Sequence, residues 1–395
     1  VLFIFSGMGL AQRPPIKNGK VIATIPFQGY DESVPIKGEI EYRIYYGANQ
    51  RKLKKPIIVI DGFDPLDKRK FEDSDSNRPA DEHRSFYEIM SYGPNNKPLV
   101  PELNAKGFDV ILVNHPTYTR NGKTIDGGAD YIERNAMNLI GLITELNAEL
   151  KRNGSSEKLV IVGPSMGGQI SRYALAYMEK KNLNHNTRLW ISVDSPHLGA
   201  NIPLGLQALL FQLRDDSFEA RSFYDDQLGS NAAKQQLIEQ YQHIRNVGPN
   251  PAYLNGKTVS QGYSSSSGAP FFRRYYDNLF KNGKSGSNGY PMNLRKIAIV
   301  NGSLSGSKAY DNPFNGISDN YAGDSEKVIN MQGFSKRTKV NLVGIEANFM
   351  PKYGRTGRLL RFFKLGSRTE VFNVTNRNTR GNMDNIPGGW FPSQF

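Results

Sequence analysis

Residues 163–167 read Gly-Pro-Ser-Met-Gly, which places Ser165 at the centre of a G-x-S-x-G pattern. In this pattern the two glycines allow a sharp turn between a strand and a helix, and the turn exposes the serine hydroxyl as a nucleophile. An apolar run at 159–162 leads into the motif, and the residues after it have the pattern of a helix. The first amides of such a helix can donate hydrogen bonds to an oxyanion. The motif and its surroundings therefore predict a nucleophilic serine at position 165.

The segments around this motif alternate between strand-like and helix-like patterns. The continuous apolar run at 56–60 and the largely apolar runs at 108–113 and 158–162 are typical of strands that are buried on both faces of a parallel sheet. Helical patterns occupy 129–150 and 167–180. Further strands are predicted at 21–27, 39–46, 188–193 and 296–300. This order predicts an α/β fold, in which helices cover both faces of a mostly parallel sheet.

Four segments of the chain differ in composition. Residues 1–11 contain an apolar run followed by small residues, and we interpret them as the remnant of a signal peptide. Residues 12–200 are predicted to form the first part of the core, and 294–395 its last part, which we expect to be truncated. Residues 201–293 carry helical patterns and an aromatic cluster, and we expect a lid-like insertion there, after the sixth strand. A signal peptide implies a protein that is secreted or held in the cell envelope, at the periplasm or outer surface.

Two further segments make the chain resemble a known family. Residues 61–65 read Asp-Gly-Phe-Asp-Pro after an apolar strand, and residues 194–199 read Asp-Ser-Pro-His-Leu-Gly. Together with the serine motif they resemble the α/β-hydrolase lipases and esterases, including relatives of the GPI inositol-deacylases, over about residues 21–300. The resemblance implies an oxyanion hole made by the amides of Phe63 and Met166. Asp61 stands where this family usually has a histidine, which changes the details of that loop.

The resemblance also implies a catalytic triad in the chain order serine, acid, histidine. Asp194 follows the sixth predicted strand and is our first candidate for the acid. The other candidates follow the strand at 296–300 or lie in a turn near the end of the sequence, and they are Asp311, Asp324 and Asp384. A role in a loop or helix cap is the alternative for each of these four residues, and it is the more frequent role for such aspartates.

The general base of the triad is not evident. A serine nucleophile needs a base, normally a histidine. The histidines of the sequence are His83, His115, His185, His197 and His243. None follows the strand at 296–300, where the resemblance places the base. His197 is the candidate within the sequence, although its motif also fits a role in supporting a loop, and a histidine beyond Phe395 is the other explanation. His185 lies in an asparagine-rich turn, where we expect it to be exposed.

Composition excludes several classes of function. The chain of 395 residues has no cysteine, which excludes disulfides, thiol catalysis and cysteine zinc sites. No histidine pair has metal-ligand spacing and no phosphate loop or dinucleotide pattern occurs, so we expect neither a metal nor a cofactor. No apolar run is long enough to span a membrane. The net charge of +13 permits contact with an anionic surface, but for a secreted protein we expect no nucleic acid partner.

These features favour a secreted serine hydrolase of the lipase or esterase type. Its substrate would be an ester-containing small molecule or lipid, and Ser165 would form an acyl-enzyme. Amide or thioester hydrolysis would use the same residues. Because no base is evident, the alternative is a catalytically inactive protein of the same fold, which binds glycan, lipid or protein at the cell surface.

Overall fold

The computed structural model describes residues 15–71 except 49, 85–200 except 94, and 270–300. Between 201 and 242 it describes 202, 207, 210–211, 213–215, 217–237 and 240–242. It also describes the backbone of short strands at 258–259, 331–334, 342–347, 356–364 and 370–375.

The chain divides into two compact units, and each is made of separate stretches of sequence. The first unit comprises residues 1–128, 133–193 and 290–298. The second unit comprises residues 129–132, 194–289 and 299–395. No helix among the described residues has the length and apolar character needed to cross a membrane.

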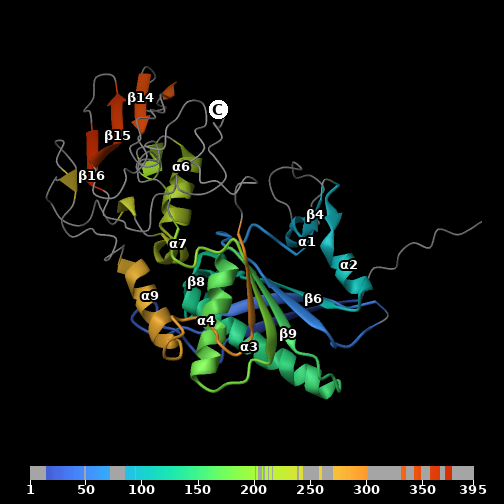
Figure 1. Cartoon of the computed structure of the whole chain (residues 1–395). Coiled ribbons are helices and arrows are strands. Elements are labelled where there is room, and N and C mark those ends of the chain that lie inside the picture. Colours follow the sequence, from blue (N-terminus) through green and yellow to red (C-terminus); the bar gives the residue numbers. More distant parts are fainter. Residues whose placement is uncertain are drawn as a thin grey trace, which may run out of the picture. The chain divides into compact units, whose positions relative to one another are not determined.

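A seven-stranded sheet forms the centre of the first unit (Figure 1). Its strands, in spatial order, are β1 (Ile16–Ile22), β2 (Glu39–Tyr45), β6 (Asp109–Asn114), β3 (Pro56–Ile60), β9 (Leu159–Pro164), β10 (Thr187–Val193) and β12 (Arg295–Ile299). β3 is parallel to both β6 and β9, and β9 is parallel to β10. β1 and β2 form an antiparallel pair, and β2 is antiparallel to β6. The predicted mostly parallel sheet is confirmed.

Helices cover both faces of this sheet, as predicted. Ile57 and Ile58 of β3 point to opposite faces, because side chains alternate along a strand. On the Ile57 face, two short helices contribute to one buried cluster: α1 (Phe86–Ile89) through Phe86, and α2 (Leu99–Ala105) through Val100.

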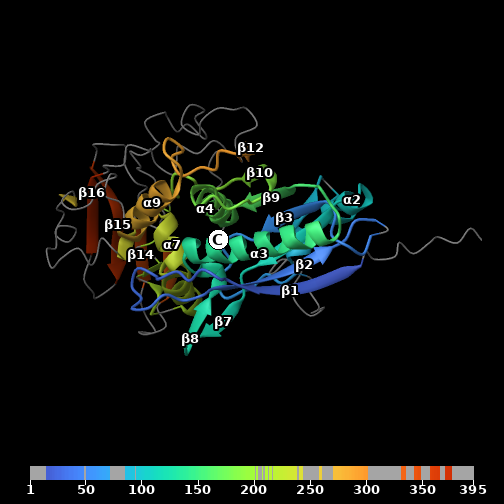
Figure 2. The ribbon, with the colours of Figure 1, turned by 90° about the horizontal axis from the view of Figure 1, so that it is seen from below.

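The Ile58 face carries the two long helices. Trp190 of β10 pairs with Ile161 of β9, which pairs with Ile58, so all three side chains share this face. The Trp190 indole N–H donates to the Ser171 hydroxyl of α4 (Met166–Lys180) at 2.9 Å. α3 (Ile132–Arg152) lies beside β1 and β2 (Figure 2). A β-carbon on its Gly141 would lie 2.9 Å from the side chain of Val21, so helix and strand pack closely there.

Two small antiparallel pairs complete the described part of the first unit. They are β4 (Ser91–Tyr92) with β5 (Lys97–Pro98), and β7 (Thr117–Arg120) with β8 (Lys123–Asp126). A 3₁₀ turn at Gly127–Ala129 leads from β8 towards α3.

The second unit contains helices and a separate sheet. Its helical elements are α6 (Phe218–Ser222), a π-helical turn (Phe223–Leu228), α7 (Asn231–Gln236) and α9 (Pro270–Asn282). The aromatic side chains of Phe272, Tyr275 and Tyr276 on α9 are buried, whereas that of Phe280 is exposed.

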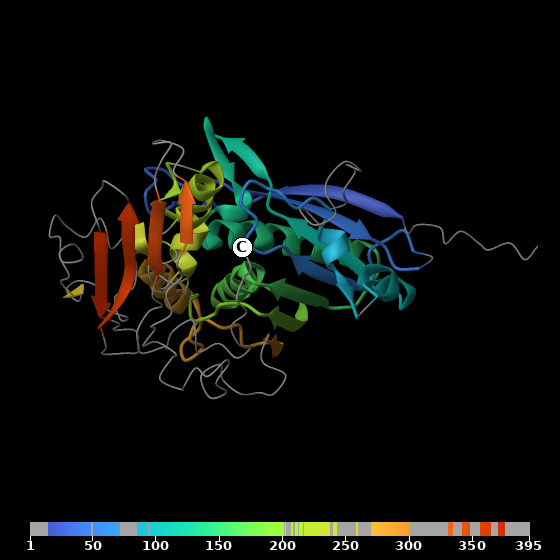
Figure 3. The same ribbon diagram turned by 90° about the horizontal axis from the view of Figure 1, so that it is seen from above.

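The second sheet has five strands, which lie side by side in Figure 3. Their order is β11 (Thr258–Val259), β16 (Glu370–Thr375), β15 (Thr356–Lys364), β14 (Leu342–Ala347) and β13 (Met331–Phe334). Residues 294–395 were expected to complete the core sheet. Of the strands described in that range, β12 belongs to the seven-stranded sheet, whereas β13–β16 pair with one another and with β11.

Candidate active site

Ser165 lies on a tight turn, because β9 ends at Pro164 and α4 begins at Met166. Its φ of 50° and ψ of −127° are values that residues with a side chain rarely adopt, and such strain is concentrated at functional sites. The Ser165 N–H donates to the Val193 carbonyl at 2.9 Å, and the Ser165 carbonyl accepts from the Gly168 N–H at 3.1 Å. Ser165 is thus an exposed residue on a strained strand-to-helix turn.

Both glycines of the motif are required by close backbone contacts. A β-carbon on Gly163 would lie 2.6 Å from the carbonyl oxygen of Gly167. One on Gly167 would lie 2.6 Å from the carbonyl oxygen of Ile60, the last residue of β3. Each distance is shorter than two such atoms tolerate, so a larger residue at either position would displace the backbone. The start of α4 therefore packs directly against the end of β3.

Residues 61–64, which we call the oxyanion loop, follow β3 and pass close to Ser165. A β-carbon on Gly62 would lie 3.1 Å from the β-carbon of Ser165 and 3.6 Å from its hydroxyl oxygen. The Asp61 N–H donates to the carbonyl of Val113 on β6 at 3.0 Å, which fixes the start of the loop. Phe63, one of the two predicted oxyanion donors, is therefore in the loop that approaches the serine. The other, Met166, is the first residue of α4.

Arg69 contacts three of the four residues of the oxyanion loop. Its Nη2 donates to the Phe63 carbonyl at 2.7 Å and lies 3.2 Å from Asp61 Oδ1. Its backbone N–H donates to Asp64 Oδ2 at 2.8 Å, and its Nε lies 3.8 Å from Asp64 Oδ1. Sequence reasoning did not single out Arg69, because one cation in a charged loop carries no local signal of its contacts.

Asp61 has an unusual electrostatic environment for a residue next to a candidate nucleophile. Only 2% of Asp61 is exposed. Its Oδ1 accepts from the Gly62 N–H at 2.7 Å, and its Oδ2 has no hydrogen-bond partner among the described residues. Burial raises the pKa of Asp61 to about 7, with the Arg69 guanidinium opposing this rise and Asp64 adding to it. The Asp61 carboxyl therefore changes its charge near neutral pH.

The chain turns sharply after the oxyanion loop, and this turn brings Arg69 back to it. Leu66 and Asp67 both have positive φ values, of 67° and 49°. The Leu66 N–H donates to Asp126 Oδ2 at 2.6 Å, and the Asp67 N–H donates to the Asp64 carbonyl at 3.1 Å. Burial raises the pKa of Asp126. The hydrogen bonds of the Leu66 and Asp67 N–H groups hold these two residues in the left-handed conformation, and they fix the direction in which the chain turns back.

The predicted acid and base lie in the second unit. Asp194 directly follows β10, is exposed, has a φ of 46°, and donates its N–H to the Ile299 carbonyl at 2.7 Å. The His197 N–H donates to the Ser195 carbonyl at 2.8 Å. Their assignments to the triad stay predictions. The remaining acid candidates, Asp311, Asp324 and Asp384, lie outside the described residues.

Two histidines of the first unit are buried away from solvent. His115, directly after β6, is 2% exposed, and burial together with the nearby Arg69 charge lowers its pKa to about 4. His185 was expected to be exposed, but it is 6% exposed. Its Nδ1 accepts from the Thr187 N–H at 3.0 Å, and its Nε2 lies 3.3 Å from Glu179 Oε1. Both ring nitrogens of His185 therefore have partners in the structure. The polar residues around it in the sequence did not indicate that it is buried beside Glu179.

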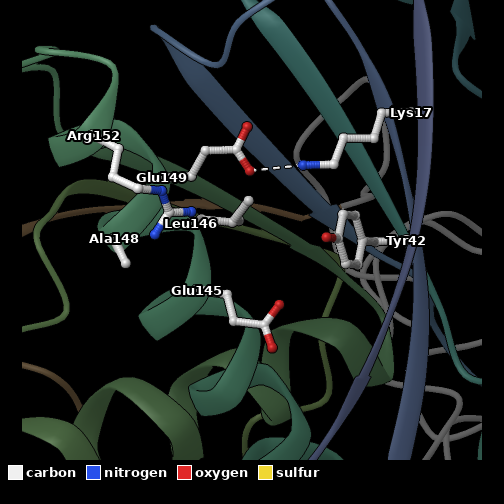
Figure 4. Close-up of a pocket in the computed structure, with 7 residues that line it drawn as sticks. All are labelled: Lys17, Tyr42, Glu145, Leu146, Ala148, Glu149 and Arg152. Atoms are coloured by element: carbon white, nitrogen blue, oxygen red, sulfur yellow. Dashed lines mark hydrogen bonds and ion pairs between the residues drawn. The ribbon is translucent and has the colours of Figure 1, made fainter.

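A separate pocket of about 290 Å³ lies in the first unit where α3 ends, before the chain enters β9 (Figure 4). Ser165 follows the opposite end of β9. The pocket is lined by Lys17, Tyr42, Glu145, Leu146, Ala148, Glu149 and Arg152. An ion pair of 2.8 Å joins Lys17 and Glu149 across it. The lining contains no serine or histidine, so it lacks the residues of a hydrolytic site. Within the described residues, no group of three or more His, Asp or Glu is arranged to hold a metal ion.

Comparisons with known proteins give one family and several distant structures. Residues 86–184, which include Ser165, match the family described as alpha/beta hydrolase fold. Brefeldin A esterase, a bacterial homologue of human hormone sensitive lipase, is 10% identical with a TM-score of 0.31, over 74% of this chain and 62% of the esterase. A bromoperoxidase from Bacillus anthracis is 14% identical with a TM-score of 0.32, over 71% of this chain and 80% of the bromoperoxidase.

XC6422 from Xanthomonas campestris, a serine hydrolase without lid, is 14% identical with a TM-score of 0.25, over 45% of this chain and 62% of XC6422. The chain thus spans less than two thirds of the esterase and of XC6422. No curated protein matches the chain in sequence.

The family match agrees with the architecture of the first unit. The third strand of the sheet along the chain lies between the fourth and the fifth, and Ser165 directly follows the fifth. The sheet order and the turn at Ser165 therefore agree with the α/β-hydrolase fold, the family that residues 86–184 match.

Proposed function

We propose that this protein is a serine hydrolase that cleaves carboxylic esters through Ser165. The observation that carries the proposal is the approach of Gly62 to Ser165, with 3.1 Å between a β-carbon on Gly62 and that of the serine. This approach brings a second strand-end loop next to an exposed, strained serine. A nucleophile and backbone amides from two loops are the parts that acyl transfer needs. The match of residues 86–184 to the alpha/beta hydrolase fold family supports a hydrolase function in general.

In the proposed reaction, Ser165 Oγ attacks the carbonyl carbon of the ester while its proton passes to a base. The amides of Met166 and Phe63 donate to the oxygen that becomes negative in the tetrahedral intermediate. The proton then passes to the leaving alcohol, and an acyl-enzyme remains. A water molecule attacks this acyl group, which releases the acid and restores the serine hydroxyl.

The proposed base is a histidine oriented by Asp194, with His197 as the candidate within this sequence. Two described histidines of the first unit do not suit the role. His185 is engaged through both ring nitrogens, and His115 is enclosed. The substrate class is an ester-containing small molecule or lipid.

The proposal is tested with the unaltered protein and the variant Ser165→Ala. We expect the unaltered protein to hydrolyse p-nitrophenyl esters and to be labelled by a fluorophosphonate, with a mass increase of one adduct. The variant should lose both. Ser155→Ala is a suitable control, since Ser155 lies in the loop before β9, away from the turn at Ser165. Its hydroxyl donates to the Lys54 carbonyl and accepts from the Glu157 N–H. Turnover by Ser165→Ala at the unaltered rate would contradict the assignment, and tight ligand binding without turnover or labelling would support the inactive binding protein instead.

A further inference from the structure

The oxyanion loop contains a peptide group whose orientation decides the proposed chemistry. The predicted donor is the N–H of Phe63, which belongs to the peptide between residues 62 and 63. This peptide adjoins Gly62, and glycine restricts the backbone less than any other residue. Glycine is nevertheless needed at this position, because a β-carbon would come within 3.1 Å of Ser165. Something other than the side chain at position 62 must therefore fix the orientation of the Phe63 amide.

The peptide groups on either side of it are both fixed by hydrogen bonds. In the preceding peptide, the Gly62 N–H donates to Asp61 Oδ1 at 2.7 Å. In the following peptide, the Phe63 carbonyl accepts from Arg69 Nη2 at 2.7 Å, and the Asp64 N–H donates to the Gly128 carbonyl at 3.1 Å. Two fixed neighbours leave the peptide between them little freedom, because only the dihedral angles of Gly62 and Phe63 remain.

Arg69 takes part in both of these restraints. The same Nη2 atom that binds the Phe63 carbonyl lies 3.2 Å from Asp61 Oδ1, the acceptor of the Gly62 N–H. Its backbone N–H and Nε both face the Asp64 carboxylate. Both side-chain restraints come from Nη2, which the planar guanidinium holds in a fixed position relative to Nε and the Asp64 carboxylate, whereas a lysine presents a compact ammonium on a flexible stem.

We propose that Arg69 is a positioning residue that orients the Phe63 amide towards the oxyanion, and this inference rests on the proposed function of Ser165. Arg69 does not touch the reacting atoms. It acts through the two peptide groups that flank the donor. Loss of one oxyanion donor typically lowers kcat by about 10²–10³-fold. A donor that is misoriented but still present should cost less, about 10–100-fold in kcat.

The test compares Arg69→Lys and Arg69→Gln with a matched control, Arg120→Lys. Arg120 has the same exposed fraction of its side chain, 28%, and makes an ion pair of 2.9 Å with Glu39. We expect Arg69→Lys to lower kcat for ester hydrolysis by about 10–100-fold with little change in KM, because ground-state binding does not use the oxyanion donor. Arg120→Lys should leave both constants near those of the unaltered protein.

Two further measurements separate positioning from a general loss of structure. Hydrogen exchange followed by mass spectrometry should become faster in peptides that contain residues 61–64, but not in those that contain β9. In Arg69→Gln, the fall in the free energy of unfolding with rising pH should also extend to higher pH, because the cation that opposes protonation of Asp61 is gone. Arg69→Lys retains the charge and should show a smaller extension.

The outcomes are distinct. Unchanged kcat in Arg69→Lys, in a protein that loses activity on Ser165→Ala, would overturn the role of Arg69 alone. A fall in kcat with equal acceleration of exchange in β9 would also overturn it, since the loss would then be structural. If the unaltered protein neither hydrolyses esters nor reacts with a fluorophosphonate, the proposed function fails, and the role of Arg69 in it fails as well.

Discussion

Gly62 and Ser165 come from different strand ends, yet a β-carbon on Gly62 would lie 3.1 Å from the β-carbon of the serine. This distance leaves room for a glycine and little more. The loop after β3 and the turn after β9 therefore approach each other at Gly62 and Ser165. The position of the loop beside the candidate nucleophile depends on the absence of a side chain at residue 62.

Substituting Gly62 tests this match. In Gly62→Ala, the added methyl group would push the oxyanion loop or Ser165 by a few tenths of an ångström, so we expect slower ester hydrolysis by about 10-fold or more. Stability should change little, because the loop can shift. Gly163→Ala is the contrasting variant: its β-carbon would meet the backbone at 2.6 Å, so we expect its main effect in the midpoint of thermal unfolding. Full activity of Gly62→Ala would show that the contact is not critical.

The stability of the protein should depend on the charge of Asp61. Its pKa is about 7 in the folded protein and about 4 in an unfolded chain. Between these values the folded state binds the proton more strongly, so the free energy of unfolding should fall as pH rises from about 4 to about 7. The fall is expected to be roughly 2–4 kcal/mol at most.

Urea unfolding of Asp61→Asn across this pH range checks the prediction. The amide is uncharged at every pH, so the slope between pH 4 and 7 should be smaller than in the unaltered protein. The exposed Glu157→Gln serves as the control and should retain the original slope. Parallel pH profiles of Asp61→Asn and the unaltered protein would contradict the raised pKa.

Asp109 should be among the more sensitive positions for stability. It begins β6, is fully buried, and its carboxylate accepts from three backbone amides, those of Gly47, Lys54 and Lys55, at 2.7–2.9 Å. Asp109→Ala would leave these donors without their acceptor, which should cost about 3 kcal/mol of unfolding free energy. Glu157→Ala should change it by less than about 0.5 kcal/mol. A loss below 1 kcal/mol in Asp109→Ala, measured by urea unfolding, would mean that water replaces the carboxylate.

The sequence predicted the centre of the sheet well and its edge less well. The run at 56–60 became β3 with the same bounds, because a strand buried on both faces is apolar at every position. The first strand was predicted at 21–27 but lies at Ile16–Ile22. Most of its side chains are exposed, so its sequence carries no apolar pattern. Its pairing with β2 fixes its position, and that contact is distant in the sequence.

The site divides in a similar way. The turn at Ser165 was predictable because the requirement for glycine acts over five neighbouring residues. The contacts of Arg69 were not, because they depend on the left-handed turn at Leu66 and Asp67, which uses no glycine. His185 was misjudged for a related reason: its partner Glu179 lies on the preceding helix, and nothing in the surrounding asparagines indicates burial.

Because the two units are made of interleaved stretches of sequence, the position of a truncation decides whether the first sheet stays complete. Each unit takes residues from three separate parts of the sequence, and β12 reaches the first sheet only after the chain has passed through residues 194–289. A gene fragment that stops at Val193 would omit β12 and leave β10 with an open edge, whose unpaired amides and carbonyls invite association with other chains. Versions of this fold that are cut at one point between β10 and β12 should therefore aggregate, whereas removal of an internal segment between these strands, with both flanks rejoined, would keep all seven strands.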